Sequence, residues 1–211
     1  MNQISLTIDG KRIQCEEGLT ILEAARSQGI DIPTICYHES LTPPGLCRQC
    51  VVEVKGARVL LPSCITEVKD GMVVETSSPR VMRARRTILE MLSASADLSE
   101  APDLKKQIDT LQAQTERFKP KVPNIQEPLI DNPFYIRDYG KCILCGKCVQ
   151  VCSEEVQLSY ALTVAGRGFD SRIATFYNRP LPETSCVFCG NCIEVCPTGA
   201  LKPRKEFENE I

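Results

Sequence analysis

The chain has 211 residues, among them 25 Lys and Arg, 27 Asp and Glu, one His, no Trp and 13 Cys. This length allows one or two compact domains with a proper hydrophobic core. A formal net charge of -2 removes the electrostatic attraction that drives nonspecific binding to nucleic acid or to anionic membranes, so we expect neither partner.

The N-terminus shows no targeting signal. Residues 1–11 alternate polar and apolar side chains instead of forming a charged segment followed by an apolar run. No stretch approaches the roughly 18 consecutive apolar residues of a membrane-spanning helix, so direct membrane insertion is not expected. We therefore expect a cytoplasmic location, where clustered thiols indicate metal ligands or redox centres rather than disulfides.

Residues 1–78 predict a small strand-rich domain. Alternating apolar residues on both sides of Asp9-Gly10 indicate a hairpin, and the capping box of Thr20 and Glu23 starts a helix. Gly29 suits the end of that helix. Further strands are predicted at 51–54, 59–61 and 72–76.

Four cysteines of this region form the first set: Cys36, Cys47, Cys50 and Cys64. A plant-type [2Fe-2S] site uses C-x4-C-x2-C with a distant fourth Cys, and only the first gap is longer here. The turn-forming segment 41–46 absorbs this extra length, and its backbone N–H groups are expected to face the cluster sulfurs and raise the potential. Taken alone, the set also suits zinc.

Residues 79–135 are predicted to form a helical spacer and an extended strap. Ser78-Pro79 caps a helix with Ile88, Leu89 and Leu92 facing inward, and a second helix covers 102–118. Prolines make the following stretch extended; they are Pro120, Pro123, Pro128 and Pro133. The first helix begins with a basic run that we interpret as a solvated face, with a docking patch for an acidic partner as the alternative; its members are Arg80, Arg83, Arg85 and Arg86.

Residues 136–211 contain an internal repeat. The segment 142–152 matches the segment 186–196 at an offset of 44 residues, with six identities in eleven positions. Each copy has the spacing C-x2-C-x2-C-x3-C, which is typical of bacterial ferredoxins with [4Fe-4S] clusters. Two copies predict two such clusters in one domain.

In this motif three thiolates converge on one cluster and the fourth Cys ligates the other cluster. Gly146 and Gly190 allow the backbone to approach the cluster closely. The predicted ligand sets are Cys142, Cys145, Cys148 with Cys196, and Cys186, Cys189, Cys192 with Cys152. Cys196 is followed by the usual Pro197, whereas Ser153 follows Cys152. Zinc sites are the alternative, although structural zinc usually takes two Cys pairs separated by a longer loop.

The remaining candidates have simpler interpretations. Cys15 lies on a predicted strand and is interpreted as a small buried apolar side chain. His38 is close to Cys36, but four cysteines already satisfy that site, so we expect a hydrogen-bonding or surface role.

The order of these motifs resembles a known family. The cysteines of a β-grasp domain are followed by residues 85–90 (RRTILE), and the paired runs enclose 166–170 (GRGFD) and 179–184 (RPLPET). This pattern is similar to the N-terminal iron–sulfur region of the large iron–sulfur subunit of respiratory NADH dehydrogenase. It is also similar to the small diaphorase subunit of NAD-linked hydrogenases, to [FeFe] hydrogenases and to NAD-dependent formate dehydrogenases. The expected fold class is α+β, with a β-grasp [2Fe-2S] domain, a helical spacer and a bacterial-type 2x[4Fe-4S] ferredoxin domain.

Two departures from the family are visible. Relatives usually carry one His and three Cys for an additional [4Fe-4S] cluster after the RRT helix, whereas residues 93–118 contain neither residue type. That cluster is expected to be absent, so electrons would pass between the remaining clusters through a different packing of the domains. The sequence also ends before any molybdenum or hydrogen-activating domain, which implies a relay without its own terminal catalyst.

The predicted function is that of an electron-transfer subunit with one [2Fe-2S] and two [4Fe-4S] clusters and no catalytic residues. No G-x-G-x-x-G or P-loop pattern occurs, so FMN or FAD and NAD(P) are expected only on partner subunits. The resemblance implies a flavin- and NAD(P)H-binding subunit and a thioredoxin-like [2Fe-2S] subunit as partners, and ferredoxin or a second flavoprotein as acceptor, with electron bifurcation as an open possibility. The alternatives are the diaphorase small subunit of an NAD-linked hydrogenase or formate dehydrogenase, and an iron–sulfur redox sensor.

Overall fold

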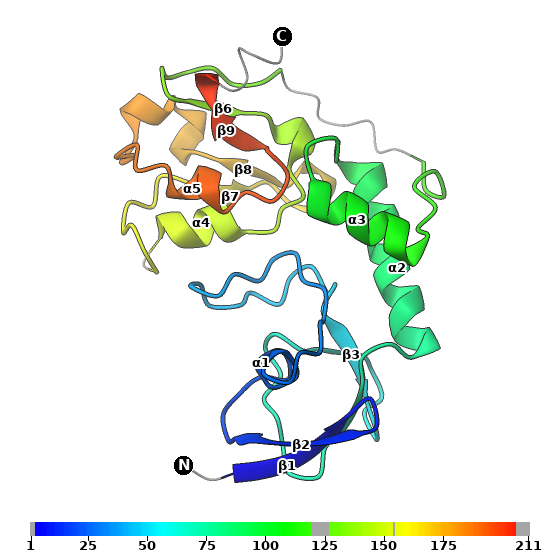
Figure 1. The fold of residues 1–211 in the computed structure, drawn as a ribbon. Helices are drawn as coiled ribbons and strands as arrows, with labels where there is room; N and C mark the ends of the chain where they lie inside the picture. Colours follow the sequence, from blue (N-terminus) through cyan, green and yellow to red (C-terminus); the bar gives the residue numbers. More distant parts are fainter. Residues whose placement is uncertain (1–2, 120–126, 154, 206–211) are drawn as a thin grey trace.

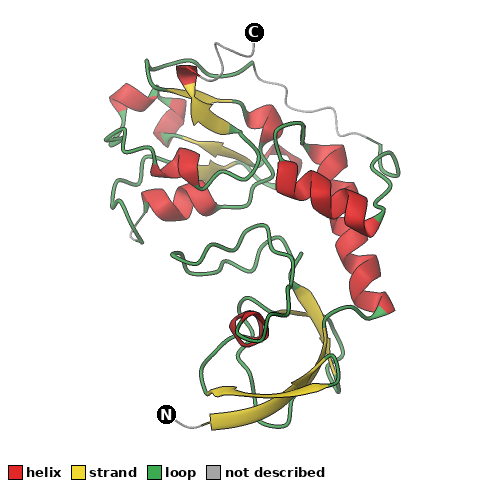
Figure 2. Ribbon diagram, in the orientation of Figure 1, coloured by secondary structure: helices red, strands yellow, loops and turns green. Residues whose placement is uncertain are grey.

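The computed structural model describes residues 3–119, 127–153 and 155–205. A strand-rich N-terminal domain and a C-terminal domain of short strands and helices are joined by two helices at one side (Figure 1). Figure 2 shows that a long loop of the N-terminal domain extends toward the C-terminal domain. This loop carries Cys36, Cys47 and Cys50.

The N-terminal domain is built on a mixed sheet with the strand order β2-β1-β5-β3-β4. β1 and β5 are parallel, and the other neighbours are antiparallel. One face packs on helix α1 around a core that includes Leu6, Ile21 and Val52. The elements are β1 (Gln3–Ile8), β2 (Lys11–Glu16), α1 (Ile21–Arg26), β3 (Val51–Val54), β4 (Leu61–Pro62) and β5 (Val73–Glu75).

The local signals of this domain are reproduced. Asp9 and Gly10 both have positive φ, as a tight turn between β1 and β2 requires. Thr20 caps α1 by accepting the Glu23 N–H, while the Glu23 carboxylate accepts the Thr20 N–H at 2.7 Å. The prediction of a strand at 59–61 was wrong in its position along the chain. The strand lies at Leu61–Pro62, where the antiparallel register sets Val51 opposite Pro62, and Val59 is exposed.

Two helices follow, α2 (Pro79–Ser95) and α3 (Pro102–Leu111). Ser78 caps α2 as predicted. The second helix is shorter than the predicted 102–118, because Gln112 adopts a left-handed conformation and ends it. Pro120 and Pro123 of the predicted strap lie outside the described residues.

The interpretation of the whole basic run as a solvated face was wrong for Arg85. Arg80, Arg83 and Arg86 are exposed, but Arg85 lies on the buried face of α2 between Val81 and Leu89, one turn away on either side. Its side chain is 4% exposed and donates to the carbonyl oxygen of Val51 at 2.8 Å. Tertiary packing of α2 against β3 therefore determines its environment.

The C-terminal domain consists of short elements around the cysteine runs. Two helices, α4 and α5, pack against each other, and two small antiparallel sheets, β6-β9 and β7-β8, complete the domain (Figure 1). The elements are β6 (Tyr135–Arg137), η1 (Tyr139–Lys141), α4 (Lys147–Cys152), β7 (Thr163–Ala165), η2 (Gly168–Asp170), β8 (Arg172–Ala174), η3 (Phe176–Asn178), η4 (Leu181–Glu183), α5 (Asn191–Glu194) and β9 (Leu201–Pro203).

The two domains are in direct contact through the cysteine loop. Leu41 shares an apolar cluster with Val151 and Val195. The Thr42 carbonyl accepts a hydrogen bond from Gln150 Nε2 at 2.6 Å, and the Thr42 N–H donates to Glu155 at 2.6 Å. The loop is thereby held against α4 and α5, beside the cysteine runs.

Candidate metal centres

The four N-terminal cysteines converge in two pairs. The Sγ atoms of Cys50 and Cys64 are 3.4 Å apart. Cys36 and Cys47 are hydrogen-bonded to each other through their side chains. The charge of Cys47 also acts on Cys50 and Cys64, so the two pairs face one site. A [2Fe-2S] cluster held by four cysteines has this two-plus-two arrangement, one thiolate pair on each iron.

Hydrogen bonding within the pairs controls the acidity of these thiols. The hydrogen bond from its partner lowers the pKa of Cys47 to about 6, and the equivalent bond lowers the pKa of Cys50 to about 6. The same bonds, assisted by burial, raise the pKa values of Cys36 and Cys64. Within each pair, loss of a proton from one thiol is eased by the hydrogen bond from the other, and a bound cation would favour loss of the remaining proton.

Backbone N–H groups point at the sulfur atoms of this site. Those of Leu46 and Cys47 act on Cys36 and oppose the rise of its pKa. The Gln49 N–H approaches the Cys47 Sγ at 3.5 Å. Such donors stabilise negative charge on a thiolate or on a cluster it holds.

Among the described residues, two buried side-chain donors around this set have no hydrogen-bond partner: Ser63 Oγ and Arg85 Nε. A buried donor without a partner is costly and calls for an explanation. Ser63 precedes Cys64 in the chain and its hydroxyl lies close enough to lower the pKa of Cys50. A cluster bound by the four thiolates would supply sulfur acceptors here, so the residues present fit the group.

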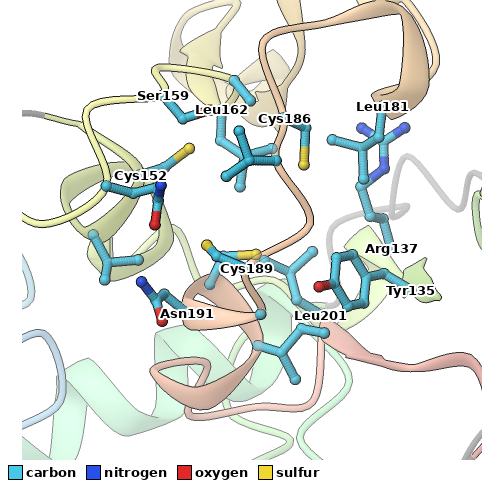
Figure 3. A pocket seen from close by; sticks show the side chains of 17 residues that line it. Tyr135, Arg137, Cys152, Ser159, Leu162, Leu181, Cys186, Cys189, Asn191 and Leu201 are labelled. Carbon is cyan, nitrogen blue, oxygen red and sulfur yellow. The ribbon is translucent and has the colours of Figure 1, made fainter.

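Each cysteine run of the C-terminal domain lines its own cavity. The first cavity is bordered by four thiols from both copies of the repeat: Cys142, Cys145, Cys148 and Cys196. The second has the reciprocal set: Cys152, Cys186, Cys189 and Cys192. Figure 3 shows the sulfur atoms of Cys152, Cys186 and Cys189 facing the second cavity, with Arg137 and Tyr135 at its border.

The two copies of the repeat have the same local geometry. Gly146 and Gly190 are the N-cap residues that precede α4 and α5, with φ of 82° and 85°, a conformation that favours glycine. Leu144 donates its N–H to the Cys142 Sγ at 3.5 Å, and Phe188 donates to the Cys186 Sγ at 3.4 Å. The sequence repeat is therefore also a repeat of backbone conformation.

Burial and mutual repulsion dominate the electrostatics of the two cavities. Burial, reinforced by the neighbouring thiolates of each set, raises the pKa of Cys142 to about 11 and that of Cys192 to about 12. Four thiolates in so confined a space need cations to balance them. Among the described residues, no group of three or more Cys, His, Asp or Glu is arranged to hold a single metal ion. Thiols spread around a cavity fit a multi-atom cluster better than a lone zinc ion, whose four ligands would lie about 3.8 Å apart.

The three thiol sets lie in sequence. Burial raises the pKa of Cys145, and the charges of Cys196 and of Cys47 raise it further, so the N-terminal set adjoins the first cavity. A Cβ placed on Gly146 would lie 3.4 Å from Leu46 Cδ1, which places the two loops in contact. After burial, the pKa of Cys148 is raised by its own set and also by Cys192 of the second set. The first cavity therefore lies between the other two sites.

The remaining candidates lie outside the three sites. Cys15 is half-buried against the N-terminal core, and burial raises its pKa. His38 Nδ1 accepts the Ser40 N–H at 3.2 Å, which is a hydrogen-bonding role. Sequence reasoning did not select Arg137, whose side chain lines the second cavity, forms an ion pair with Asp131 and keeps an unpaired Nε. No signal in the sequence distinguishes this arginine from an exposed one.

Within the described part of the chain, none of the helices is long and apolar enough to cross a membrane.

Comparisons with known proteins agree with this description. Residues 1–79 match the 2Fe-2S iron–sulfur cluster binding domain, and residues 141–200 match the 4Fe-4S dicluster domain. A chain in the crystal structure of NAD+-reducing [NiFe]-hydrogenase in the H2-reduced state has a similar fold, with a TM-score of 0.84 and 31% sequence identity; the match covers 95% of this chain and 87% of that chain. The predicted α+β fold class is confirmed.

Similar curated proteins are longer than this chain. NADP-reducing hydrogenase subunit HndD of Solidesulfovibrio fructosivorans is 42% identical over 217 residues, which cover 95% of this chain and 36% of that protein. The mitochondrial NADH-ubiquinone oxidoreductase 78 kDa subunit of Candida albicans is 33% identical over 185 residues, or 84% of this chain and 26% of that protein. NADPH-Fe(3+) oxidoreductase subunit alpha of Geobacter sulfurreducens is 38% identical over 185 residues, which cover 84% of this chain and 22% of that protein. The chain thus spans only about a fifth to a third of the length of these relatives.

Proposed function

Since the chain belongs to the iron–sulfur family that includes the 78 kDa subunit of NADH-ubiquinone oxidoreductase, subunit HndD and the NAD+-reducing hydrogenase chain, we propose that it relays single electrons within an NAD(P)H-linked oxidoreductase complex. The resemblance drawn from the sequence is confirmed, and so is the presence of a 2Fe-2S domain and a 4Fe-4S dicluster domain. The finer assignment has three parts: the clusters and their ligands, the route between them, and the partners.

Twelve thiolates would hold one [2Fe-2S] and two [4Fe-4S] clusters. In the N-terminal site, Cys36 and Cys47 would bind one iron and Cys50 and Cys64 the other, a proposal that the pairing of these thiols supports. The two cavities support the crossed assignment of the repeat, with Cys196 in the first set and Cys152 in the second. When bound, such clusters accept and release one electron at a time.

The order of the three sites is the observation that carries the proposal. The charge of Cys47 acts on Cys145, and that of Cys192 acts on Cys148, while Leu46 lies against Gly146. These observations support a series of sulfur sites that runs from the N-terminal loop through the C-terminal domain. The loop 35–50 makes this approach because Leu41 and Thr42 hold it against α4 and α5. In the second C-terminal set Cys189 is exposed, which suits exchange with a partner.

The chain's own residues hold and tune the relay. Backbone N–H groups of residues 49, 144 and 188 donate to sulfur atoms, and the surrounding apolar side chains exclude water. A flavin- and NAD(P)H-binding subunit would supply electrons singly, with a thioredoxin-like [2Fe-2S] subunit beside it. Ferredoxin or a second flavoprotein would be the acceptor, and such an assembly would be suited to bifurcation. No substrate-converting site belongs to this chain in the proposal.

A second candidate is the diaphorase small subunit of an NAD-linked hydrogenase. The fold similarity to a chain of NAD+-reducing [NiFe]-hydrogenase and the 42% identity to a subunit of an NADP-reducing hydrogenase favour it. The two candidates share the relay and differ in the partner that receives the electrons. Anaerobic isolation of the intact complex distinguishes them, because a nickel-containing companion supports the hydrogenase and a second flavoprotein supports the first proposal.

Metal analysis of anaerobically purified protein tests the relay itself. We expect about ten iron atoms per chain with matching acid-labile sulfide, and reducible paramagnetic signals of both cluster types. About four irons, stoichiometric zinc or the absence of reducible signals would refute the proposal.

A further inference from the structure

Arg85 is a buried cation beside the N-terminal cysteine set. The helix α2 packs on β3, and this contact brings the Arg85 guanidinium to the carbonyl oxygen of Val51 at 2.8 Å, one residue after Cys50. The side chain is 4% exposed, and its Nε is a buried donor without a partner in the described part of the chain. A long charged side chain is rarely buried without an ion pair.

The charge of Arg85 is not neutralised by a close acid. Among the described residues, no carboxylate forms an ion pair with it. Two acids, Asp31 and Asp9, raise the pKa of Arg85 through their negative charge. Asp9 already accepts hydrogen bonds from the N–H and the hydroxyl of Thr76. The negative charge of Cys50 acts on Arg85 more strongly than either acid.

The guanidinium remains protonated despite its burial. Burial lowers the pKa of Arg85 to about 10, while Cys50 and the two acids oppose that change. At neutral pH the group therefore carries a full positive charge within a poorly solvated region. The desolvation free energy of this buried charge is compensated when the neighbouring cysteine site holds a negatively charged group.

We propose that Arg85 is a tuning residue of the N-terminal cluster site, whose buried charge stabilises the reduced state and raises the midpoint potential. The inference rests on the proposed [2Fe-2S] assignment. Reduction adds one electron and no proton, so the net charge held by the four thiolates becomes more negative by one. A fixed cation at close range favours that state, and a low local dielectric strengthens the effect.

Substitution of Arg85 by Gln tests the charge. Gln removes the positive charge but keeps an N–H donor for the Val51 carbonyl. We expect the equilibrium constant for one-electron reduction of the [2Fe-2S] site to fall at least tenfold, which is about 59 mV for a one-electron couple. Arg85→Lys keeps the charge and should remain within threefold of the wild type.

Arg83→Gln is the matched control, because Arg83 is an exposed arginine two residues earlier on the same helix. Potentials would be measured by redox titration of the anaerobically purified full chain, followed by paramagnetic resonance at temperatures where the [4Fe-4S] signals have broadened. The potential of the [2Fe-2S] site in Arg83→Gln should equal that of the wild type. The [4Fe-4S] potentials should stay unchanged in Arg85→Gln and in Arg85→Lys.

The outcomes separate this inference from the assignment beneath it. Absence of a [2Fe-2S] signal in the wild type would refute the assignment. A normal signal with a potential within threefold of the wild type in Arg85→Gln would refute only the tuning role. If Arg85→Gln lost the cluster, Arg85→Lys decides: retention with the wild-type potential supports the charge, and loss in both variants shows a purely structural arginine and overturns the inference.

Discussion

Glu90→Gln is expected to loosen the segment that follows α3. Glu90 lies on the inner side of α2 with a side chain only 1% exposed. Its Oε1 accepts the Gln114 N–H at 3.0 Å, and its Oε2 accepts from the Arg117 guanidinium at 2.7 Å. One buried carboxylate therefore fastens residues 114–117 to the helix that carries Arg85.

The magnitude follows from these two contacts. A hydrogen bond to a charged group contributes about 1.5–3 kcal/mol. The Arg117 side chain is 50% exposed, so its ion pair is screened and is worth about 1 kcal/mol. Gln can still accept one of the two bonds but turns an amide N–H2 toward the other donor. We expect a loss of about 2 kcal/mol, which corresponds to about a 30-fold increase in local opening.

Hydrogen exchange of the backbone amides measures this opening directly. Peptides covering residues 112–119 should exchange about 30-fold faster in Glu90→Gln, at constant pH and without oxygen, if exchange follows local opening. Glu116→Gln is the control, because Glu116 is an exposed glutamate in the same turn. A change of less than threefold relative to that control would refute the argument.

The same carboxylate predicts a dependence on pH. Burial alone would raise the pKa of Glu90, but the Gln114 N–H and the Arg117 guanidinium outweigh it and hold the pKa below its usual 4.5. The contribution of Glu90 is therefore complete above the pKa of the unfolded chain and is lost as the pH falls through the lower folded value. The difference in exchange between wild type and Glu90→Gln should shrink below about pH 4; a difference that stays constant on acidification would contradict this reasoning.

The remaining predictions concern the C-terminal domain. Cys196→Ala should abolish or alter the signal of the cluster held by the first run, and Cys152→Ala that of the second run, as resolved by Mössbauer or paramagnetic resonance spectroscopy; the opposite pairing would exclude crossed ligation. Gly166→Ala should destabilise the β7-β8 hairpin, because its Cβ would overlap the Asp170 carbonyl oxygen. Gly168→Ala also has a positive φ but meets no atom within 4 Å, so it should cost only about 1–2 kcal/mol in thermal or denaturant unfolding; equal losses in both variants would contradict the predicted clash.

The segment between the two domains forms a network of ion pairs with the C-terminal domain. Glu100, after α2, forms ion pairs with Lys141 and with Lys202. Lys141 also lies 3.3 Å from Asp138. These contacts attach the spacer to the C-terminal domain, while Gln49 Nε2 of the cysteine loop donates a hydrogen bond to Gln107 Oε1 of α3 at 3.0 Å. The spacer therefore positions both domains, which is a structural role consistent with its lack of Cys and His.

Local signals in the sequence were sufficient for many of the elements and for the class of cofactor. The Asp9-Gly10 turn, the Thr20 capping box and the Ser78 cap lie where they were predicted, because each depends on residues close in the chain. The repeated cysteine spacing has the same basis, since a tight loop of fixed length determines where three thiols point. The domain boundaries and the ligand sets stay predictions.

Only the tertiary structure decided which groups meet across the domains. Nothing in the spacing of the cysteines predicts that the charge of Cys47 acts on Cys145, because this approach depends on the packing of the loop 35–50 against α4 and α5. Nor does the composition of the basic run distinguish Arg85 from Arg83, although the positions of Val81 and Leu89 a turn away on either side were a usable signal. Burial of a charge and proximity of distant thiols are properties of the packed molecule, because the energies involved arise between residues that are far apart in the chain.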